Sequence, residues 1–189
     1  GIANFKNAGA AFTKTAQCSN TDATVGTTTV SCTLTLTSGR LVVVLGEFEG
    51  LPTSMTVTDG TNTYTQDTTN RHSNNDLESQ FHYVLSSAAS GSTTVTLTLG
   101  AARTFKRLGV YEFSYSGTIA LDTSNRTQSS GTSVTSGNIT TTGSGSEAVI
   151  AHYGDYSGST LTSPQINGVA ADGSINPFTS RFRHCGIAS

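Results

Sequence analysis

Glu47 and Glu112 are the residues whose type and spacing most directly suggest chemistry. Each acid follows a short apolar run, which covers residues 41–45 in one case and begins at Leu108 in the other. If these runs are neighbouring strands, the carboxylates face each other across one sheet, as the catalytic pair of a jelly-roll glycoside hydrolase does. The alternative is two solvated acids at strand ends. The chain has no tryptophan to stack on a sugar ring, and this favours the alternative.

Metal binding is the second chemical possibility. The chain has four histidines, which are His72, His82, His152 and His184. None of them pairs with another at i,i+2 or i,i+4, so a zinc site would depend on the fold to gather them. Asp59 with Asn62, or Asp155 in its loop, offers oxygen ligands for calcium. The same residue types are ordinary turn formers, and we therefore expect no metal and no cofactor.

Nucleophilic catalysis has weak support. The chain is rich in serine, but no segment has the pattern of a nucleophile elbow. Cys185 lies beside His184, but adjacent residues of a strand point to opposite faces of the sheet. Lys6, Lys14 and Lys106 could each join an asparagine through an isopeptide bond, with Glu47 or Glu112 as the assisting acid, although nothing in the spacing demands it. We expect that the protein is not an enzyme.

Three cysteines, Cys18, Cys32 and Cys185, cannot form a fully paired disulfide framework. Cys18 and Cys32 are close enough in sequence to bridge two adjacent segments in an oxidising compartment. The other interpretation takes Cys32 as a small apolar residue on the inner face of a strand. Asn125 and Asn138 begin the triplets Asn-Arg-Thr and Asn-Ile-Thr, which are formal acceptors for N-linked glycans. In a bacterial or phage protein such triplets would usually carry no sugar.

Composition excludes several partners. Only 12% of the 189 residues are charged and the formal net charge is -2, so hydroxyls and amides must cover the surface. There is no basic field to neutralise phosphates, which argues against nucleic acid. No charge run would target the chain to a membrane surface, and no stretch approaches the length of a transmembrane helix. We expect no membrane insertion.

Period-2 alternation predicts strands rather than helices. Residues 30–36 and 95–99 alternate apolar side chains with threonine or serine, and residues 78–85 alternate as well. Asp59-Gly60 lies between two short strand-like segments, which predicts a hairpin. The polar residues 66–76 predict an exposed loop.

Three apolar runs, residues 41–48, 108–113 and 148–151, predict inner strands with both faces covered. Residues 28–36 and 93–99 resemble each other, and each copy leads into an apolar strand that ends in Glu-Phe. We interpret this similarity as the common pattern of a strand with one solvent-exposed face followed by a strand buried on both faces, rather than as a duplication. The strands predict an all-β fold, an antiparallel β-sandwich of the immunoglobulin-like or jelly-roll kind, as one domain over residues 25–189. Residues 1–24 are expected to be an irregular lead-in.

Several segments resemble immunoglobulin-like or jelly-roll β-sandwich modules of bacterial surface and phage virion proteins. Residues 57–65 (Val-Thr-Asp-Gly-Thr-Asn-Thr-Tyr-Thr) resemble the hairpin of these modules. Residues 111–114 (Tyr-Glu-Phe-Ser) and 137–142 (Gly-Asn-Ile-Thr-Thr-Thr) resemble two later segments, and the match covers roughly residues 25–155. These motifs specify turns and strand edges, so they imply fold better than function. The modules usually close with an apolar strand that carries a tryptophan, which is absent here.

The resemblance and the composition together lead us to expect a non-enzymatic structural module, either secreted or on a cell or virion surface. It would assemble with copies of itself or dock on a larger scaffold, through a sheet edge that lacks its closing strand. A carbohydrate-binding or adhesin module is the first alternative. Its ligand-binding residues would be the exposed tyrosines, namely Tyr64, Tyr83, Tyr153 and Tyr156. A glycoside hydrolase that uses Glu47 and Glu112 is the second alternative.

Overall fold

The computed structural model of the chain describes residues 1–9, 11–50, 52–73, 77–127, 138–142, 145–154, 165–166, 169–170 and 182–188. The strands are β1 (Ile2–Asn7), β2 (Thr13–Asp22), β3 (Thr29–Leu36), β4 (Leu41–Glu49), β5 (Met55–Thr58), β6 (Thr65–Ser73), β7 (Leu77–Val84), β8 (Gly91–Leu99), β9 (Lys106–Ser114), β10 (Ile119–Asn125), β11 (Ser146–Gly154), β12 (Gln165–Ile166), β13 (Val169–Ala170) and β14 (Phe182–Ala188). These ranges contain no helix, and hence none that is long and apolar enough to cross a membrane.

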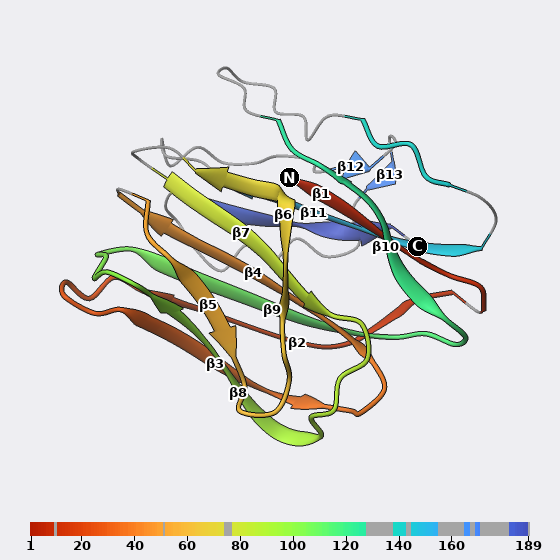
Figure 1. Ribbon diagram of the computed structural model, residues 1–189, viewed down its shortest axis with the longest axis horizontal. Helices are drawn as coiled ribbons and strands as arrows, with labels where there is room; N and C mark the ends of the chain where they lie inside the picture. Colours follow the sequence, from red (N-terminus) through yellow and green to blue (C-terminus); the bar gives the residue numbers. More distant parts are fainter. Residues whose placement is uncertain are drawn as a thin grey trace. The chain divides into compact units, whose positions relative to one another are not determined.

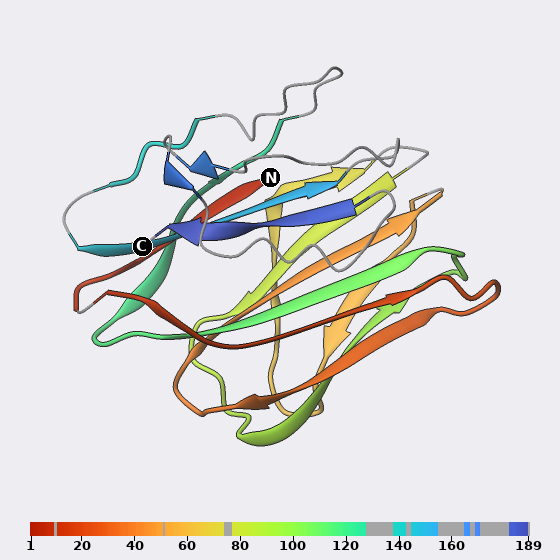
Figure 2. The same ribbon diagram turned by 180° about the vertical axis from the view of Figure 1, so that it is seen from behind.

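The chain divides into two compact units. Unit 1 comprises Gly1–Phe12 with Tyr115–Ser189, and unit 2 comprises Thr13–Ser114. Unit 2 contains a five-stranded sheet in the order β2-β9-β4-β7-β6 and a three-stranded sheet in the order β3-β8-β5, and every pairing is antiparallel. The two sheets form two layers, which both ribbon views show (Figure 1, Figure 2). The predicted all-β antiparallel sandwich is confirmed.

The core of unit 2 lies between these two sheets. Val42, Val44 and Phe48 of β4 meet residues of the three-stranded sheet in one cluster of buried side chains. On β3 the inner residues are buried or half-buried while Thr29, Thr33 and Thr35 are exposed, because successive side chains of a strand point to opposite faces. Threonine on alternate positions therefore marks the solvent face of this sheet, as the sequence predicted.

A disulfide between Cys18 and Cys32 joins the two layers of unit 2. Cys18 lies on β2, the edge strand of the five-stranded sheet, and Cys32 lies on β3, the edge strand of the three-stranded sheet. The Cα atoms are 5.9 Å apart. Near this disulfide the side-chain amide of Asn20 donates a hydrogen bond of 2.7 Å to the backbone oxygen of Ser31. The edge strands β2 and β3 are therefore joined by the disulfide and by the hydrogen bond from Asn20 to Ser31.

The predicted hairpin at Asp59-Gly60 is wrong, although the turn is real. β5 belongs to the three-stranded sheet and β6 to the five-stranded sheet, so the turn carries the chain from one layer to the other. The Asp59 carboxylate accepts hydrogen bonds from the backbone N–H groups of Thr61 and Asn62, and Gly60 has φ 81°. This local chemistry fixes a turn but not the partner of the next strand.

The prediction of an exposed loop over residues 66–76 is wrong for residues 66–73, which belong to β6 at the edge of the five-stranded sheet. Residues 74–76 lie outside the described residues. Pairing between β6 and β7 is irregular, since the register shifts between Asp67 and His72. The polar side chains of β6 do not alternate with apolar ones. Because that alternation is the sequence signal for a strand, β6 could not be recognised from the sequence.

Unit 1 contains a four-stranded antiparallel sheet in the order β10-β1-β11-β14. The first 24 residues are therefore not the irregular lead-in that the sequence predicted, because they form β1 and β2 in two different sheets. Asn4 and Asn7 of β1 are as buried as Phe5 is, and these buried amides hide the apolar pattern of the strand. The side-chain amide of Asn4 donates a 3.3 Å hydrogen bond to the carboxylate of Asp122 on β10.

Candidate functional site

A row of polar side chains follows β7 and crosses to β6. Glu78, Gln80 and His82 alternate along β7 and therefore share one face of the sheet. Gln66 is opposite His82 in the strand register, which places it on the same face. Arg71 of β6 contacts the carboxylate of Glu78, with Nη2 2.7 Å from Oε1. We call these five residues the β7 polar row.

The β7 polar row lies on the side of the sheet that faces the second layer. Gln80 is opposite Gly46 in β4, and His82 is opposite Val44, which belongs to the core between the sheets. A Cβ atom on Gly46 would come within 2.2 Å of Leu97 and 2.6 Å of Met55. Glycine at position 46 therefore permits the close approach of the three-stranded sheet.

Hydrogen bonds join the members of the row to one another. Gln66 donates to the side-chain oxygen of Gln80 at 3.0 Å, and Gln80 donates to Glu78 at 2.7 Å. His82 Nε2 lies 3.1 Å from the same Gln80 oxygen. The exposed fractions of Glu78, Gln80 and His82 are 0%, 2% and 4%.

This network fixes the proton positions of the row. An ionised Glu78 carboxylate only accepts hydrogen bonds, so the amide nitrogen of Gln80 must face it and the amide oxygen must face His82. Nε2 of His82 is then the protonated nitrogen of a neutral ring. Burial lowers the pKa of His82 to about 4, which keeps the ring neutral near pH 7. The contacts hold strands in register, and they form no pairing of a nucleophile with a base.

Acidification is expected to destabilise the protein through His82. In the unfolded chain the His82 ring binds a proton near its ordinary pKa of 6.5, whereas in the folded protein its pKa is about 4. Stability from this group is therefore complete above pH 6.5 and is lost as the pH falls through this window, by roughly 3 kcal/mol. A His82→Gln variant, which can still donate to Gln80, should lack this part of the pH dependence. Titration of the His82 ring by NMR checks the assignment, and an ordinary pKa near 6.5 would contradict it.

The structure does not bring Glu47 and Glu112 together. Glu112 is opposite Val42 and Glu47 is opposite Arg107, in a register between β4 and β9 that has no shift. Positions 42 and 47 are five positions apart, an odd step along β4, so the two acids lie on opposite faces of the sheet. They are also about 17 Å apart along the strands at about 3.4 Å per residue. The similarity of the two Glu-Phe segments therefore does not mark equivalent positions, and the proposed glycosidase pair is not assembled.

Each of the two acids has a separate setting. Glu112 accepts hydrogen bonds from the hydroxyl of Thr15 at 2.6 Å, from Arg40 at 2.9 Å and from the backbone N–H of Thr37. It thus ties β2 and the turn before β4 to β9. The carboxylate of Glu47 is buried without a hydrogen-bond partner among the described residues. Burial raises the pKa of Glu47 to about 8, although the charge of Arg107 opposes the shift.

Among the described residues, Tyr64 and Tyr83 of the predicted glycan-binding tyrosines are not brought together. Tyr64 packs against the core between the sheets, and its hydroxyl donates a 3.0 Å hydrogen bond to Asp59. Burial and the Asp59 charge raise the pKa of Tyr64 well above its ordinary range. Tyr83 lies on the opposite face of β7 from His82. The side chain of Tyr153 and all of Tyr156 lie outside the described residues.

No group of three or more metal-ligating side chains occurs in the part of the chain that the structure describes. Burial works to raise the pKa of Asp59, but hydrogen bonds from Asn62 and Thr61 hold it below the ordinary value. Those bonds occupy the carboxylate as a turn former. Asp155 lies outside the described residues. His184 and Cys185 are consecutive residues of β14, and their side chains are likewise outside the described part.

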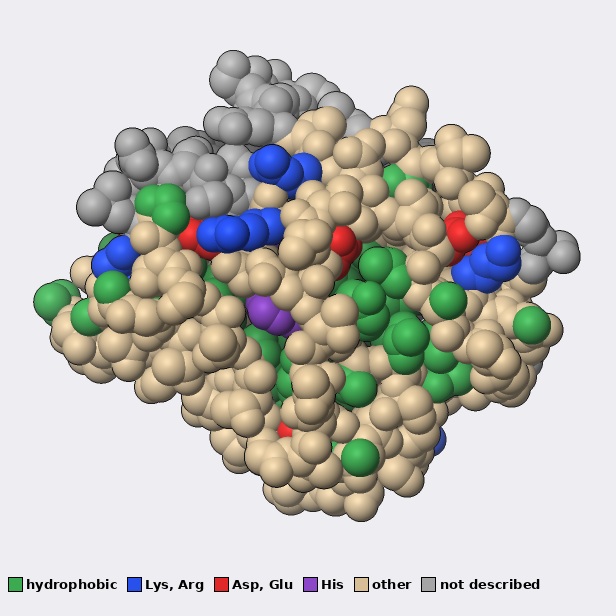
Figure 3. Space-filling model, viewed as in Figure 1, with side chains coloured by type: hydrophobic (Ala, Val, Ile, Leu, Met, Phe, Trp, Pro, Cys, Tyr) green, Lys and Arg blue, Asp and Glu red, His purple; other side chains and the backbone are tan. Residues whose placement is uncertain are grey.

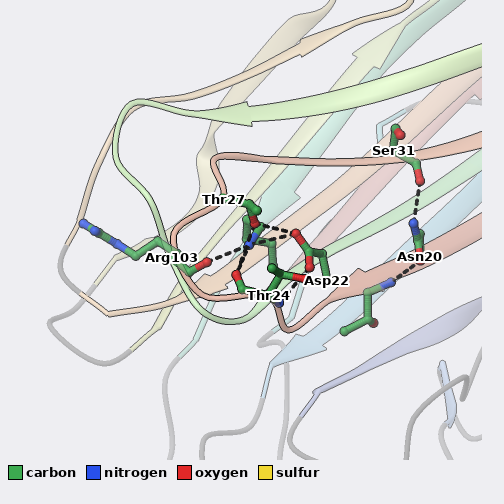
Figure 4. A network of polar contacts seen from close by, with 8 residues as sticks. Asn20, Asp22, Thr24, Thr27, Ser31 and Arg103 are labelled. Atoms are coloured by element: carbon green, nitrogen blue, oxygen red, sulfur yellow. Dashed lines mark hydrogen bonds and ion pairs between the residues drawn. The ribbon is translucent and has the colours of Figure 1, made fainter.

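A second polar cluster surrounds Lys106, whose side chain is completely buried. Figure 4 shows Asp22 of this cluster beside Thr24 and Thr27. Its ammonium nitrogen lies 3.1 Å from the carboxylate of Asp22 and donates to the backbone oxygen of Arg103 at 2.6 Å. Asp22 also accepts from the backbone N–H of Thr24 at 2.7 Å and from the hydroxyl of Thr27 at 2.6 Å. Hydrogen bonds from Thr24 and Thr27, and a smaller one from Lys106, hold the pKa of Asp22 well below its ordinary range, although burial opposes the shift.

Neither acid proposed to assist an isopeptide bond, Glu47 or Glu112, lies beside Lys106. This lysine is opposite Phe48 and therefore points away from the face of Glu47. Glu112 is six positions further along the same strand. The carboxylate that Lys106 meets is Asp22, in an ion pair that stabilises two loops.

Sequence reasoning missed both the β7 polar row and the Asp22–Lys106 pair. The alternation of Gln80 and His82 against Phe81 and Tyr83 is visible in the sequence, and it marks these polar residues as a solvent face. No sequence signal shows that a second layer buries that face. No protein-family model, no curated protein and no solved structure matches this chain. Inference about function therefore depends on the residues and contacts above.

Proposed function

We propose that the protein is a non-enzymatic structural module of an extracellular or virion surface, which assembles with copies of itself or docks on a larger scaffold. The main support for this proposal is that buried charged side chains in unit 2 join strands and loops to one another. Glu112, Glu78 and Lys106 each reach across to a different strand or loop, and each is tied there by an ion pair. Such contacts stabilise a fold and do not converge on a point where a substrate would react.

The disulfide supports an extracellular location. Cys18 and Cys32 join the two layers of unit 2, and disulfides persist mainly in oxidising compartments. Resemblance of residues 57–65 to modules of bacterial surface and phage virion proteins supports the same setting.

The surface is suited to contacts that do not depend on charge. The solvent face of the three-stranded sheet presents threonine in register across strands, since Thr29 is opposite Thr98 and Thr33 is opposite Thr94. On the face drawn in Figure 3, backbone and uncharged side chains that are not hydrophobic cover most of the surface, charged side chains form small separate groups, and hydrophobic side chains gather near the middle. A surface of this kind favours packing against neutral polar surfaces over steering by an electric field.

The native mass of the protein tests the proposal. Light scattering of the purified full chain over a dilution series should give an integer multiple of the chain mass if the module assembles with copies of itself. A monomer at all concentrations would exclude self-assembly. Docking on a larger scaffold would then be tested by binding of the purified protein to a surface or virion preparation from the source.

A glycan array separates the proposal from its first alternative. Of the tyrosines expected to bind a glycan, Tyr64 packs against the core between the sheets and Tyr83 lies on the opposite face of β7 from that core, so these two do not form a common sugar-binding surface. Specific binding to a glycan by a monomeric protein would nevertheless replace the structural role with a carbohydrate-binding one. Absence of binding together with a stable assembly would support the structural role.

A further inference from the structure

Two formal acceptor triplets for N-linked glycans lie in unit 1. Asn125 begins Asn-Arg-Thr and Asn138 begins Asn-Ile-Thr. The disulfide between Cys18 and Cys32 is typical of proteins that fold in an oxidising compartment, where such acceptors can meet a glycosylating enzyme. The structure distinguishes the two asparagines clearly.

Asn138 is held in a position that presents it to solvent. The described segment 138–142 is not part of a strand, and both Asn138 and Thr140 are exposed. Ile139 between them is half-buried and packs against the cluster formed by Ile2 and Val149. The apolar residue thus anchors the segment, while the two residues that a glycosylating enzyme must recognise point away from the sheet.

Both polar atoms of the Asn125 side-chain amide form hydrogen bonds. It is the last residue of β10, is half-buried and is paired with Ile2 of β1. Its Nδ2 donates a 2.8 Å hydrogen bond to the backbone oxygen of Asn138, and its Oδ1 accepts a 2.8 Å hydrogen bond from the N–H of Arg126. A glycan on Nδ2 would therefore have to grow from an atom that ties β10 to segment 138–142.

We infer that, in a cell that attaches N-linked glycans to secreted proteins, Asn138 is an acceptor and Asn125 is not. The donor is a lipid-linked oligosaccharide, and the enzyme is an oligosaccharyltransferase. A bond forms between C1 of the first sugar and Nδ2 of Asn138, while the bond from C1 to the pyrophosphate oxygen breaks. The lipid pyrophosphate leaves with the bonding electrons, and Nδ2 loses one proton. The Asn125 amide keeps its hydrogen bond to the Asn138 backbone, which the modification of the Asn138 side chain does not alter.

The test uses the full chain, secreted from cells that carry out N-glycosylation. Enzymatic removal of the glycan in heavy-oxygen water converts a modified asparagine into labelled aspartate, and peptide mapping should find this label at position 138 alone. Asn138→Gln and Thr140→Ala should abolish the glycan, whereas Thr140→Ser should retain it. Asn125→Gln is the matched control and should leave the glycan in place.

The wild-type map decides the matter even if a variant is poorly secreted. A label at position 125 would overturn the assignment, and so would unmodified peptides at both positions from cells that modify a reference glycoprotein. The inference does not require assembly, so its failure would leave the structural role standing.

Discussion

Asp22→Asn is expected to lower the free energy of unfolding by about 3 kcal/mol, which is near the lower end for breaking a buried ion pair. The substitution leaves the ammonium of Lys106, with an exposed side-chain fraction of 0%, without its counter-charge. Two features moderate the cost. Asp22 itself is 21% exposed, and the backbone oxygen of Arg103 still accepts a hydrogen bond from Lys106. Asparagine at position 22 can still accept from the N–H of Thr24, but its NH2 group replaces the oxygen that accepts from Thr27, so the change removes the charge and one acceptor.

A double-mutant cycle gives this prediction its control. Lys106→Met removes the buried charge and leaves Asp22 partly solvated, so it should cost less than Asp22→Asn. The combination of both changes should be less destabilising than Asp22→Asn alone, because no charge then remains buried. Lys14→Met, at a half-buried lysine on β2, is the matched substitution and should have little effect. Chemical denaturation measures all four variants. Additive costs would mean that Asp22 and Lys106 do not interact energetically.

Removal of the disulfide is expected to cost about 3 kcal/mol, because the bond closes a loop of 14 residues and limits the unfolded chain. Cys18→Ala with Cys32→Ala should therefore shift the denaturation midpoint strongly downward. The loss should be seen as weaker attachment of β3 to β2, the edge strands that the bond joins. Hydrogen exchange of the β3 amides measures this local effect.

The third cysteine requires a control for disulfide exchange. Cys185→Ser should be introduced into both the reference protein and the double variant, so that the comparison concerns one bond. Reduction of the reference protein should lower its free energy of unfolding by as much as the two alanine substitutions do. Equal stability of oxidised and reduced protein would show that the bond adds nothing to the fold.

Much of the architecture could be predicted from local pattern. The alternation over residues 30–36 and 95–99 has a period set by the strand backbone itself, and both segments are strands with a threonine face. The apolar run at residues 41–45 indicated a strand with both faces covered, and Leu41 through Phe48 are all buried in β4. Such signals need no knowledge of partners, because side-chain direction follows from the backbone.

Residues whose role depends on a partner strand were harder to assign. β6 and β1 carry polar residues that become buried, so their sequences do not show the apolar alternation of a strand. Asp59-Gly60 correctly indicated a turn, but only the tertiary fold decides whether the next strand pairs with the previous one or enters another sheet.

The all-β fold class can be predicted from the sequence alone, because strand alternation and turn chemistry are local properties of the backbone. Which acids and amides lie together, in contrast, depends on how the strands pair and the layers pack. Glu47 and Glu112 have the same place in their sequence patterns, yet strand register puts them on opposite faces. Lys106 and Asp22 are far apart in the chain, and pairing of β2 with β9 places them opposite each other. Register and layer packing involve residues distant in sequence, and this is why they could not be predicted from local pattern.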